Sequence, residues 1–239
     1  MTKKTIGIIG GMGPEATSDL FAKIISLTPA QKDQEHIRII IDNNPQIPDR
    51  TAFILGKGKN PLKELLRSAK LLKKAGADIL IMPCNTAHFF LSDIKKEIGL
   101  PFISIIDSAL NDLKESFPKA EKIAILATTG TKAAKIYDKP FIKAGYKVLD
   151  FSKEIQDNIM TAIYDGVKKG KTQEASIDFQ KTIDKIESDL KPDIFIAACT
   201  EIPILMQYTV SKAPLIDATK SLAKAAVKYA FNRKNNGQK

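Results

Sequence analysis

The sequence predicts an α/β fold of two pseudo-symmetric domains, each a mainly parallel four-stranded sheet flanked by helices. Two observations lead to this prediction. Apolar runs of four to six residues alternate with longer segments of helical period, which is typical of parallel β/α units. Short segments from the first half of the 239-residue chain also recur, in the same order, in the second half.

The individual elements follow from the apolar periodicity and from residues that begin or end helices. Pro61 suits the first turn of a helix, and Gly76 and Gly145 suit the position just after a helix end. The predicted strands are residues 5–9, 37–41, 79–82, 102–106, 122–126, 146–149, 194–197 and 214–216. The predicted helices are residues 15–26, 61–75, 89–98, 132–144, 155–168, 172–190 and 219–231.

Three pairs of short segments relate the two halves, at a nearly constant offset of about half the chain. The pairs are TIGIIGGMG (5–13) with KIAILATTG (122–130), ADILIMPCNT (77–86) with PDIFIAACTE (192–201), and IIDS (105–108) with LIDA (215–218). We infer that the second half is inserted before the last helix returns to the first. The predicted domains are therefore residues 1–103 plus 212–239, and residues 104–211.

Composition narrows the classes of partner. The formal charge is +10, but the lysines alternate with apolar residues at helical spacing and form no aromatic-basic repeat, so we expect solvated helix faces and no nucleic-acid partner. No apolar run approaches the ~18–20 residues that span a bilayer, and the N-terminus lacks a signal-peptide core. We therefore expect no membrane association and a cytoplasmic location, where thiols stay reduced. Two distant cysteines and two histidines also predict no zinc cluster.

The two cysteines are the most informative residues. Cys84 and Cys199 each follow a predicted strand at matching positions of the repeat, and in parallel sheets sites lie at the carboxyl ends of strands. A single cysteine usually packs as a small hydrophobic residue. Two in equivalent places, each followed by polar residues that can begin a helix, favour a chemical role, because a helix start lowers a thiol pKa. One thiolate can then remove a proton from one face of a carbon while the other thiol donates to the opposite face.

Two other chemistries are weaker interpretations of the same residues. A Cys84–His88 hydrolase dyad, one helical turn apart, leaves Cys199 unexplained. The turn from Gly11 to Ala16 fits a dinucleotide fingerprint, but the acidic residue expected ~20 positions later does not end a strand. We expect this loop instead to bring Met12 and backbone amides close to a small substrate.

Several strings together resemble a known family. GGMGP (10–14), NPQIPDR (44–50), MPCNTAH (82–88) and CTE (199–201) are similar to the cofactor-independent aspartate racemases of the aspartate/glutamate racemase superfamily. The resemblance runs nearly the whole chain and includes ATTGT (127–131) and IYDGVK (163–168). Glutamate racemases typically carry Cys-Thr-His at the second cysteine, so Cys199-Thr200-Glu201 resembles the aspartate branch.

The resemblance implies a two-base racemase that interconverts L- and D-aspartate, with Cys84 and Cys199 flanking the α-carbon in the cleft between the domains. It implies no pyridoxal phosphate, no metal and, commonly, a homodimer. Arg50 and Lys168 become ligands for the side-chain carboxylate, because a guanidinium suits bidentate carboxylate binding. The other expected substrate-binding residues are Met12 and the post-strand donors Asn85, Thr86, Thr128 and Thr200.

Other functions stay open at this point. A maleate-isomerase-like enzyme of the same superfamily would use a cysteine as nucleophile on a C=C bond. A broad-specificity Asp/Glu racemase would use the same residues on more substrates. A non-catalytic dicarboxylate-binding protein would bind aspartate without exchanging its α-proton, and an oxidoreductase would bind NADH.

Overall fold

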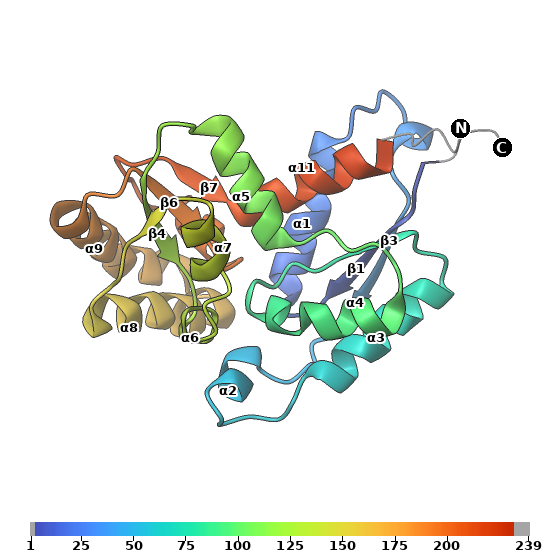
Figure 1. Cartoon of the computed structure of the whole chain (residues 1–239), viewed down its shortest axis with the longest axis horizontal. Coiled ribbons are helices and arrows are strands. Elements are labelled where there is room, and N and C mark those ends of the chain that lie inside the picture. Colours follow the sequence, from blue (N-terminus) through green and yellow to red (C-terminus); the bar gives the residue numbers. More distant parts are fainter. Residues whose placement is uncertain (1–2, 232–239) are drawn as a thin grey trace.

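Apolar segments form two parallel sheets, one in each half of the computed structural model, which describes residues 3–231 (Figure 1). The first sheet contains, in spatial order, β2 (Ile39–Asn43), β1 (Ile6–Gly10) and β3 (Ile79–Ile81). The second contains β5 (Lys147–Val148), β4 (Lys122–Leu126), β6 (Ile194–Ala197) and β7 (Leu215–Asp217).

The two sheets repeat one arrangement. In each, the first strand of the half is flanked by the next strand on one side and by the strand that precedes a cysteine on the other. Thus β1 pairs with β3 from the register Ile6↔Ile79, and β4 pairs with β6 from Ile123↔Ile194. All of these pairings are parallel. The predicted α/β class and the similarity of the two halves are confirmed.

One prediction about the sheets was wrong. Residues 102–106 were expected to form a fourth strand of the first sheet, but only Phe102 pairs, in an isolated parallel bridge with Leu80. Helix α5 (Ile105–Ser116) begins instead, because the Ser104 side chain accepts a hydrogen bond from the Asp107 N–H and caps it. Within residues 3–231 the first sheet therefore has three strands and the second has four.

The chain crosses between the halves at its C-terminal end. Strand β7 lies in the range 212–239, which the sequence assigned to the first domain, yet it pairs with β6 of the second sheet. Helix α11 (Ala218–Phe231) then packs against α1 (Pro14–Leu27) and α5. Figure 1 shows α11 and α5 lying side by side between the two lobes. The assignment of β7 to the first domain is thus corrected, and the other domain limits stay a prediction.

The remaining helices pack around the sheets, and several are shorter than predicted. The predicted helix 132–144 is split because Lys135 adopts a left-handed conformation with φ of 53°. The predicted helix 155–168 changes to a π-helical turn and then a 3₁₀ turn. The helices are α2 (Arg50–Ile54), α3 (Leu62–Lys74), α4 (Leu91–Ile98), α6 (Thr129–Ala133), α7 (Asp138–Lys143), α8 (Lys153–Thr161), α9 (Thr172–Leu190), α10 (Ile202–Leu205), η1 (Asp33–Glu35), η2 (Thr86–Phe90), η3 (Ala162–Gly166) and η4 (Val167–Lys169).

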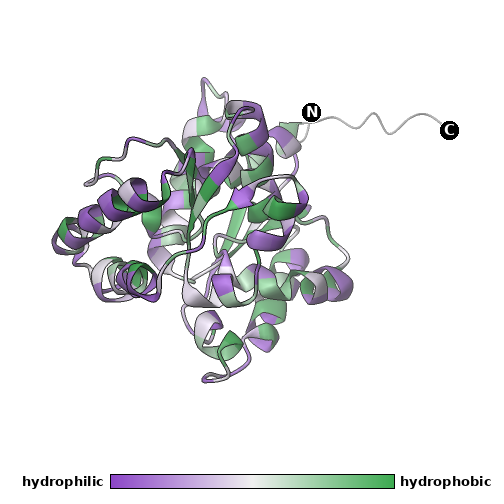
Figure 2. Ribbon diagram, turned by 60° about the vertical axis from the view of Figure 1, so that its left-hand side comes forward, coloured by the Kyte–Doolittle hydropathy of each residue, from purple (hydrophilic) through white to green (hydrophobic). Residues whose placement is uncertain are grey.

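One hydrophobic core joins the two halves. It contains side chains of β1 and β3, of β4 and β6, and of the crossing helices α5 and α11, including the fully buried Leu113 and Leu222. Figure 2 shows apolar strands inside and hydrophilic outer helix faces. Among the helices formed by residues 3–231, none is long and apolar enough to cross a bilayer.

The shared core predicts a stability effect at α11. Leu222→Ala should lower the free energy of unfolding by about 2–5 kcal/mol, because it leaves a cavity where the two halves meet. Urea denaturation followed by circular dichroism measures this change. Lys228→Ala on the exposed face of the same helix is the control and should stay within about 0.5 kcal/mol of the unaltered protein. Equal effects of the two substitutions would contradict the shared core.

Candidate active site

The carboxyl ends of the two sheets enclose one small cavity. Its atom-free volume is about 290 Å³, including space open to solvent. Its walls come from both halves: Met12, Asp49, Arg50, Thr51, Cys84, Asn85, Thr86, Thr128, Tyr164, Lys168, Cys199, Thr200 and Glu201. All nine residues predicted from the sequence are among them. The structure therefore brings together every predicted site residue, while their roles stay predictions.

The two thiols enter this cavity from equivalent turns. Cys84 lies three residues after β3 and Cys199 two residues after β6. They are free thiols with 6% and 7% of their surface exposed. The helices that follow are short, since η2 has five residues and α10 has four. Helices this short have small dipoles, so they stabilise a thiolate only weakly.

The surroundings of Cys199 oppose a thiolate, contrary to the lowered thiol pKa expected from the sequence. Burial raises the pKa of Cys199 well above its ordinary value, and the Glu201 carboxylate adds to this effect. The Cys199 Sγ lies 2.9 Å from Glu201 Oε2, and Thr200 Oγ1 lies 3.1 Å from the same oxygen. Lys168 Nζ pairs with Glu201 Oε1 at 2.8 Å. Lys168 is thus already paired with a carboxylate of the chain.

Arg50 supplies a buried cation with an unused hydrogen-bond donor. Its Nη1 donates to the carbonyls of Ile47 and Pro48 at 3.2 and 3.0 Å, and its Nη2 donates to Met12 O at 3.3 Å. Burial acts against the charge, but Cys84, Asp49 and Tyr164 together outweigh burial, so the pKa of Arg50 is raised. The Nε–H is buried without a partner.

Asn85 supplies a second unused donor. Its Oδ1 accepts a hydrogen bond of 2.5 Å from the Tyr137 hydroxyl, which orients the amide, while its Nδ2 is buried without a partner. An unpaired buried donor costs about 1–3 kcal/mol. A carboxylate in the cavity would satisfy both Asn85 and Arg50, because a carboxylate accepts hydrogen bonds at both oxygens.

Threonine hydroxyls join the two halves beside the cavity. Thr51 and Thr86 of the first half bond to Thr128 at 3.2 and 3.0 Å, and Thr86 also bonds to Thr131 at 2.9 Å. Gly130 permits this approach, since a Cβ there would lie 2.8 Å from the Thr51 Cα. The hydroxyls of Thr86 and Thr128, predicted as substrate donors, are therefore engaged with each other. Sequence reasoning missed Thr51 and Thr131 because their contact is long-range.

A tyrosine closes the cavity from the second half. The Tyr164 hydroxyl donates to Asp49 Oδ2 at 3.0 Å, while Asp49 Oδ1 caps α2 through the Ala52 N–H at 2.7 Å. Tyr164 lies in η3, a π-helical turn, and such turns are frequent at functional sites. Tyr164 and Asp49 lie within the family-like strings 163–168 and 44–50, but neither was assigned a role.

His88 forms hydrogen bonds with backbone groups and does not activate a thiol. Its Nδ1 lies 2.9 Å from Cys84 O, and its Nε2 accepts a hydrogen bond from the Ile105 N–H at 3.2 Å. The ring is therefore neutral with its proton on Nδ1, and burial lowers the pKa of His88 to about 4. Because both ring nitrogens are occupied by backbone groups, the Cys84–His88 hydrolase dyad is not formed.

The glycine turn after β1 has a packing explanation. Gly11 adopts φ of 92°, and a Cβ at this position would lie 2.3 Å from the carbonyl carbon of Asn44. The glycine thus lets the loop that carries Arg50 approach the turn closely. This contact accounts for the glycine without a dinucleotide.

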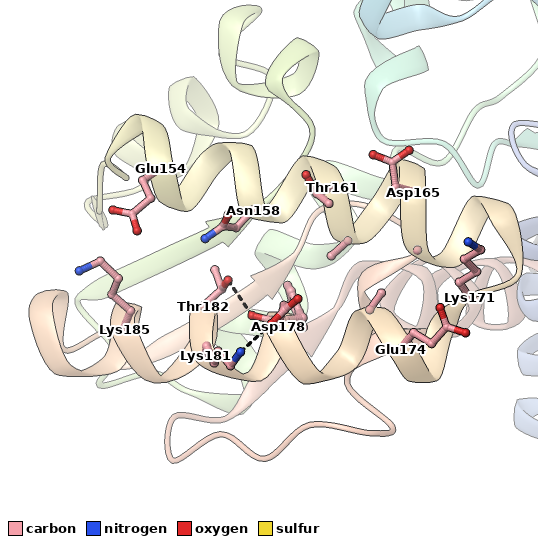
Figure 3. Close-up of a pocket in the computed structure, with 14 residues that line it drawn as sticks. Glu154, Asn158, Thr161, Asp165, Lys171, Glu174, Asp178, Lys181, Thr182 and Lys185 are labelled. Atoms are coloured by element: carbon pink, nitrogen blue, oxygen red, sulfur yellow. Dashed lines mark hydrogen bonds and ion pairs between the residues drawn. The ribbon is translucent and has the colours of Figure 1, made fainter.

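A larger hollow lies between α8 and α9 but lacks these features (Figure 3). It measures about 1130 Å³, including open solvent, and its walls carry charged side chains such as Lys181 and Asp178, which pair with each other at 2.8 Å. Both side chains are more than 70% exposed. Neither a cysteine nor an unpartnered buried donor is found among its described wall residues. The smaller cavity is therefore the candidate active site.

The buried neutral His88 predicts a pH dependence of stability. The pKa of His88 is lower in the folded protein than in the unfolded chain, so protonation favours the unfolded chain. The free energy of unfolding is therefore at its full value above about pH 6.5 and decreases as the pH falls from 6.5 toward 4. Between pH 7 and 5 this loss should amount to about 2 kcal/mol. Urea denaturation at both pH values measures it. His88→Gln should remove that part of the pH dependence, and an unchanged dependence would contradict the assignment.

Comparison with known proteins agrees with this geometry. The sequence profile of the Asp/Glu/Hydantoin racemase family matches residues 9–226. The broad specificity amino-acid racemase RacX of Bacillus subtilis (strain 168) is 28% identical over 231 residues, which cover 93% of this chain and 96% of RacX. The Picrophilus torridus aspartate racemase structure has a TM-score of 0.83 and 31% identity, over 96% of this chain and 95% of that one. This chain belongs to the Asp/Glu/hydantoin racemase family.

Proposed function

We propose that the protein is an aspartate racemase that uses Cys84 and Cys199 as its two acid/base groups and needs no cofactor. One observation carries the proposal: thiols from opposite halves line one small buried cavity, beside a buried arginine that has an unused donor. Opposed thiols suit inversion at a carbon atom, because removal and delivery of the proton occur on opposite faces.

The unpartnered donors explain how the substrate would be held. The Nε–H of Arg50 and the Nδ2 of Asn85 are satisfied when a substrate carboxylate lies between them and the thiols. During proton removal, negative charge develops on that carboxylate, and preorganised donors stabilise it. A substrate that fills the small cavity would displace water from it, which strengthens these interactions.

The choice of substrate depends on the second carboxylate of aspartate. Similarity to the P. torridus aspartate racemase supports aspartate. A broad-specificity amino-acid racemase is the second candidate, supported by the similarity to RacX and by the pairing of Lys168 with Glu201. If Lys168 stays paired with Glu201, it offers less charge to a side-chain carboxylate, and neutral side chains are then tolerated. Chiral chromatography of products from L-aspartate, L-glutamate and neutral L-amino acids separates these candidates, and a parallel assay on maleate tests the isomerase alternative.

Removal of either thiol should abolish racemisation. Loss of one member of an acid/base pair costs about 10²–10⁴-fold in rate. The racemisation rates of Cys84→Ala and Cys199→Ala should each be lower than that of the unaltered protein by at least this factor. Chiral chromatography of L-aspartate reactions measures the rate, and circular dichroism verifies folding. Near-normal turnover in either variant would overturn the two-thiol proposal.

Arg50 should control substrate affinity. Arg50→Lys keeps the charge but loses the Nε–H donor and the planar fork. Hydrogen bonds to charged groups contribute about 1.5–3 kcal/mol, so KM for aspartate should rise about 10- to 100-fold. Initial rates over a range of aspartate concentrations provide this value. Arg67→Lys, at an arginine whose side chain is 81% exposed, is the control. An unchanged KM in Arg50→Lys would remove Arg50 from the binding site.

A further inference from the structure

The two copies of the internal repeat differ in sequence next to the cysteine. Cys84-Asn85-Thr86 and Cys199-Thr200-Glu201 occupy equivalent positions after β3 and β6, so Thr86 and Glu201 correspond. The Thr86 hydroxyl bonds to threonines of the other half and not to Cys84. The Glu201 carboxylate instead accepts a hydrogen bond from Cys199, the cysteine of its own copy of the repeat. The two thiols thus share a backbone position but have different neighbours.

Glu201 is held as a buried, ionised acceptor. Only 5% of its surface is exposed, and its carboxylate contacts Cys199 Sγ at 2.9 Å, Thr200 Oγ1 at 3.1 Å and Lys168 Nζ at 2.8 Å. Burial raises the pKa of Glu201, but the charge of Lys168 and the hydrogen bonds from Cys199, Lys168 and the backbone together keep that pKa below its ordinary value. An ionised carboxylate only accepts hydrogen bonds, so the proton of the Cys199–Glu201 contact belongs to sulfur.

The charges around Cys84 differ from those around Cys199. Cys84 neighbours the guanidinium of Arg50, and the carboxylate of Asp49 is engaged by Tyr164 and by the start of α2. At Cys199 the facing titratable groups are Glu201, Lys168 and the neutral Tyr137. Lys168 also lies near Cys84, and its positive charge is paired with Glu201. The thiolate form is therefore opposed at Cys199 by an adjacent negative charge, whereas a cation faces Cys84.

We propose that Glu201 is a positioning residue that keeps the proton on Cys199, so that Cys199 enters the reaction as the proton donor and Cys84 as the base. This inference rests on the proposed two-thiol function. In the forward step the Cys84 thiolate takes the α-proton, which forms an S–H bond and breaks the C–H bond. The electron pair left on carbon then takes the proton of Cys199, which leaves Cys199 as the thiolate beside Glu201. The reverse step returns both protons, so the reaction is balanced.

The test isolates one thiol at a time. In Cys84→Ala the remaining thiol is Cys199, and the pH dependence of its alkylation by iodoacetamide gives its pKa without any need for racemase activity. Adding Glu201→Gln replaces the carboxylate by an amide of nearly equal shape. The pKa of Cys199 should then fall by at least about one unit. Because thiolate nucleophilicity also falls with pKa, alkylation at pH 7 should rise at least about threefold.

The repeat provides a matched control. In Cys199→Ala the remaining thiol is Cys84, and adding Glu201→Gln there should change its alkylation less than about twofold, since Glu201 contacts Cys199 and not Cys84. Glu201→Asp in the Cys84→Ala background retains the negative charge and should keep the pKa of Cys199 high. An unchanged or higher pKa of Cys199 in Cys84→Ala/Glu201→Gln would overturn the inference. Absence of racemisation in the unaltered protein would instead overturn the proposed function, while the alkylation result would still stand.

Discussion

The hydroxyls of Thr51, Thr86, Thr128 and Thr131 form a buried hydrogen-bonded cluster between the two halves, and the geometry of the site depends on this contact. Because each half alone contributes one thiol, neither half has a site of its own. The cluster, with Gly130 packed on Thr51, holds the carboxyl ends of the two sheets together. The core shared through α5 and α11 supports the same arrangement through a separate set of apolar contacts.

Two features of the cavity follow from this close approach. First, groups that approach from opposite halves pair with each other, as Tyr164 does with Asp49. Second, the donors left over, on Arg50 and Asn85, have no acceptor in the described part of the chain. The carboxylate of the proposed substrate would satisfy them. The cavity thus combines a rigid frame with a small unsatisfied polar surface.

Much of this site could be predicted from the sequence, because the repeat and the family-like strings mark backbone positions at strand ends. The post-strand placement of Cys84 and Cys199 and the gathering of all nine predicted residues at one cavity are of this kind. The end of a strand could not be predicted where a local cap competed with the apolar pattern, as Ser104 does before α5. Long-range side-chain partners, such as Glu201 for Lys168, could not be predicted from the sequence either.

The pairing of Lys168 with Glu201 changes how the duplicated scaffold is understood. The repeat alone suggests two equal thiols, but the difference between Thr86 and Glu201 at equivalent positions gives them unequal electrostatic surroundings. A racemase needs one thiol to release and the other to accept a proton in each turnover. In the proposed mechanism the unequal surroundings prepare these roles before the substrate binds, and the same pairing would reduce the charge that Lys168 can offer to a second carboxylate.

The most direct test of the two-thiol racemase is exchange of the α-proton of L-aspartate in D₂O, followed by NMR together with chiral analysis of the product. The two-thiol mechanism predicts that D-aspartate forms and carries deuterium at the α-carbon, because Cys199 delivers a solvent-derived deuteron to the face opposite Cys84. Recovery of L-aspartate after prolonged incubation, with its α-proton and its configuration both unchanged, would contradict this mechanism.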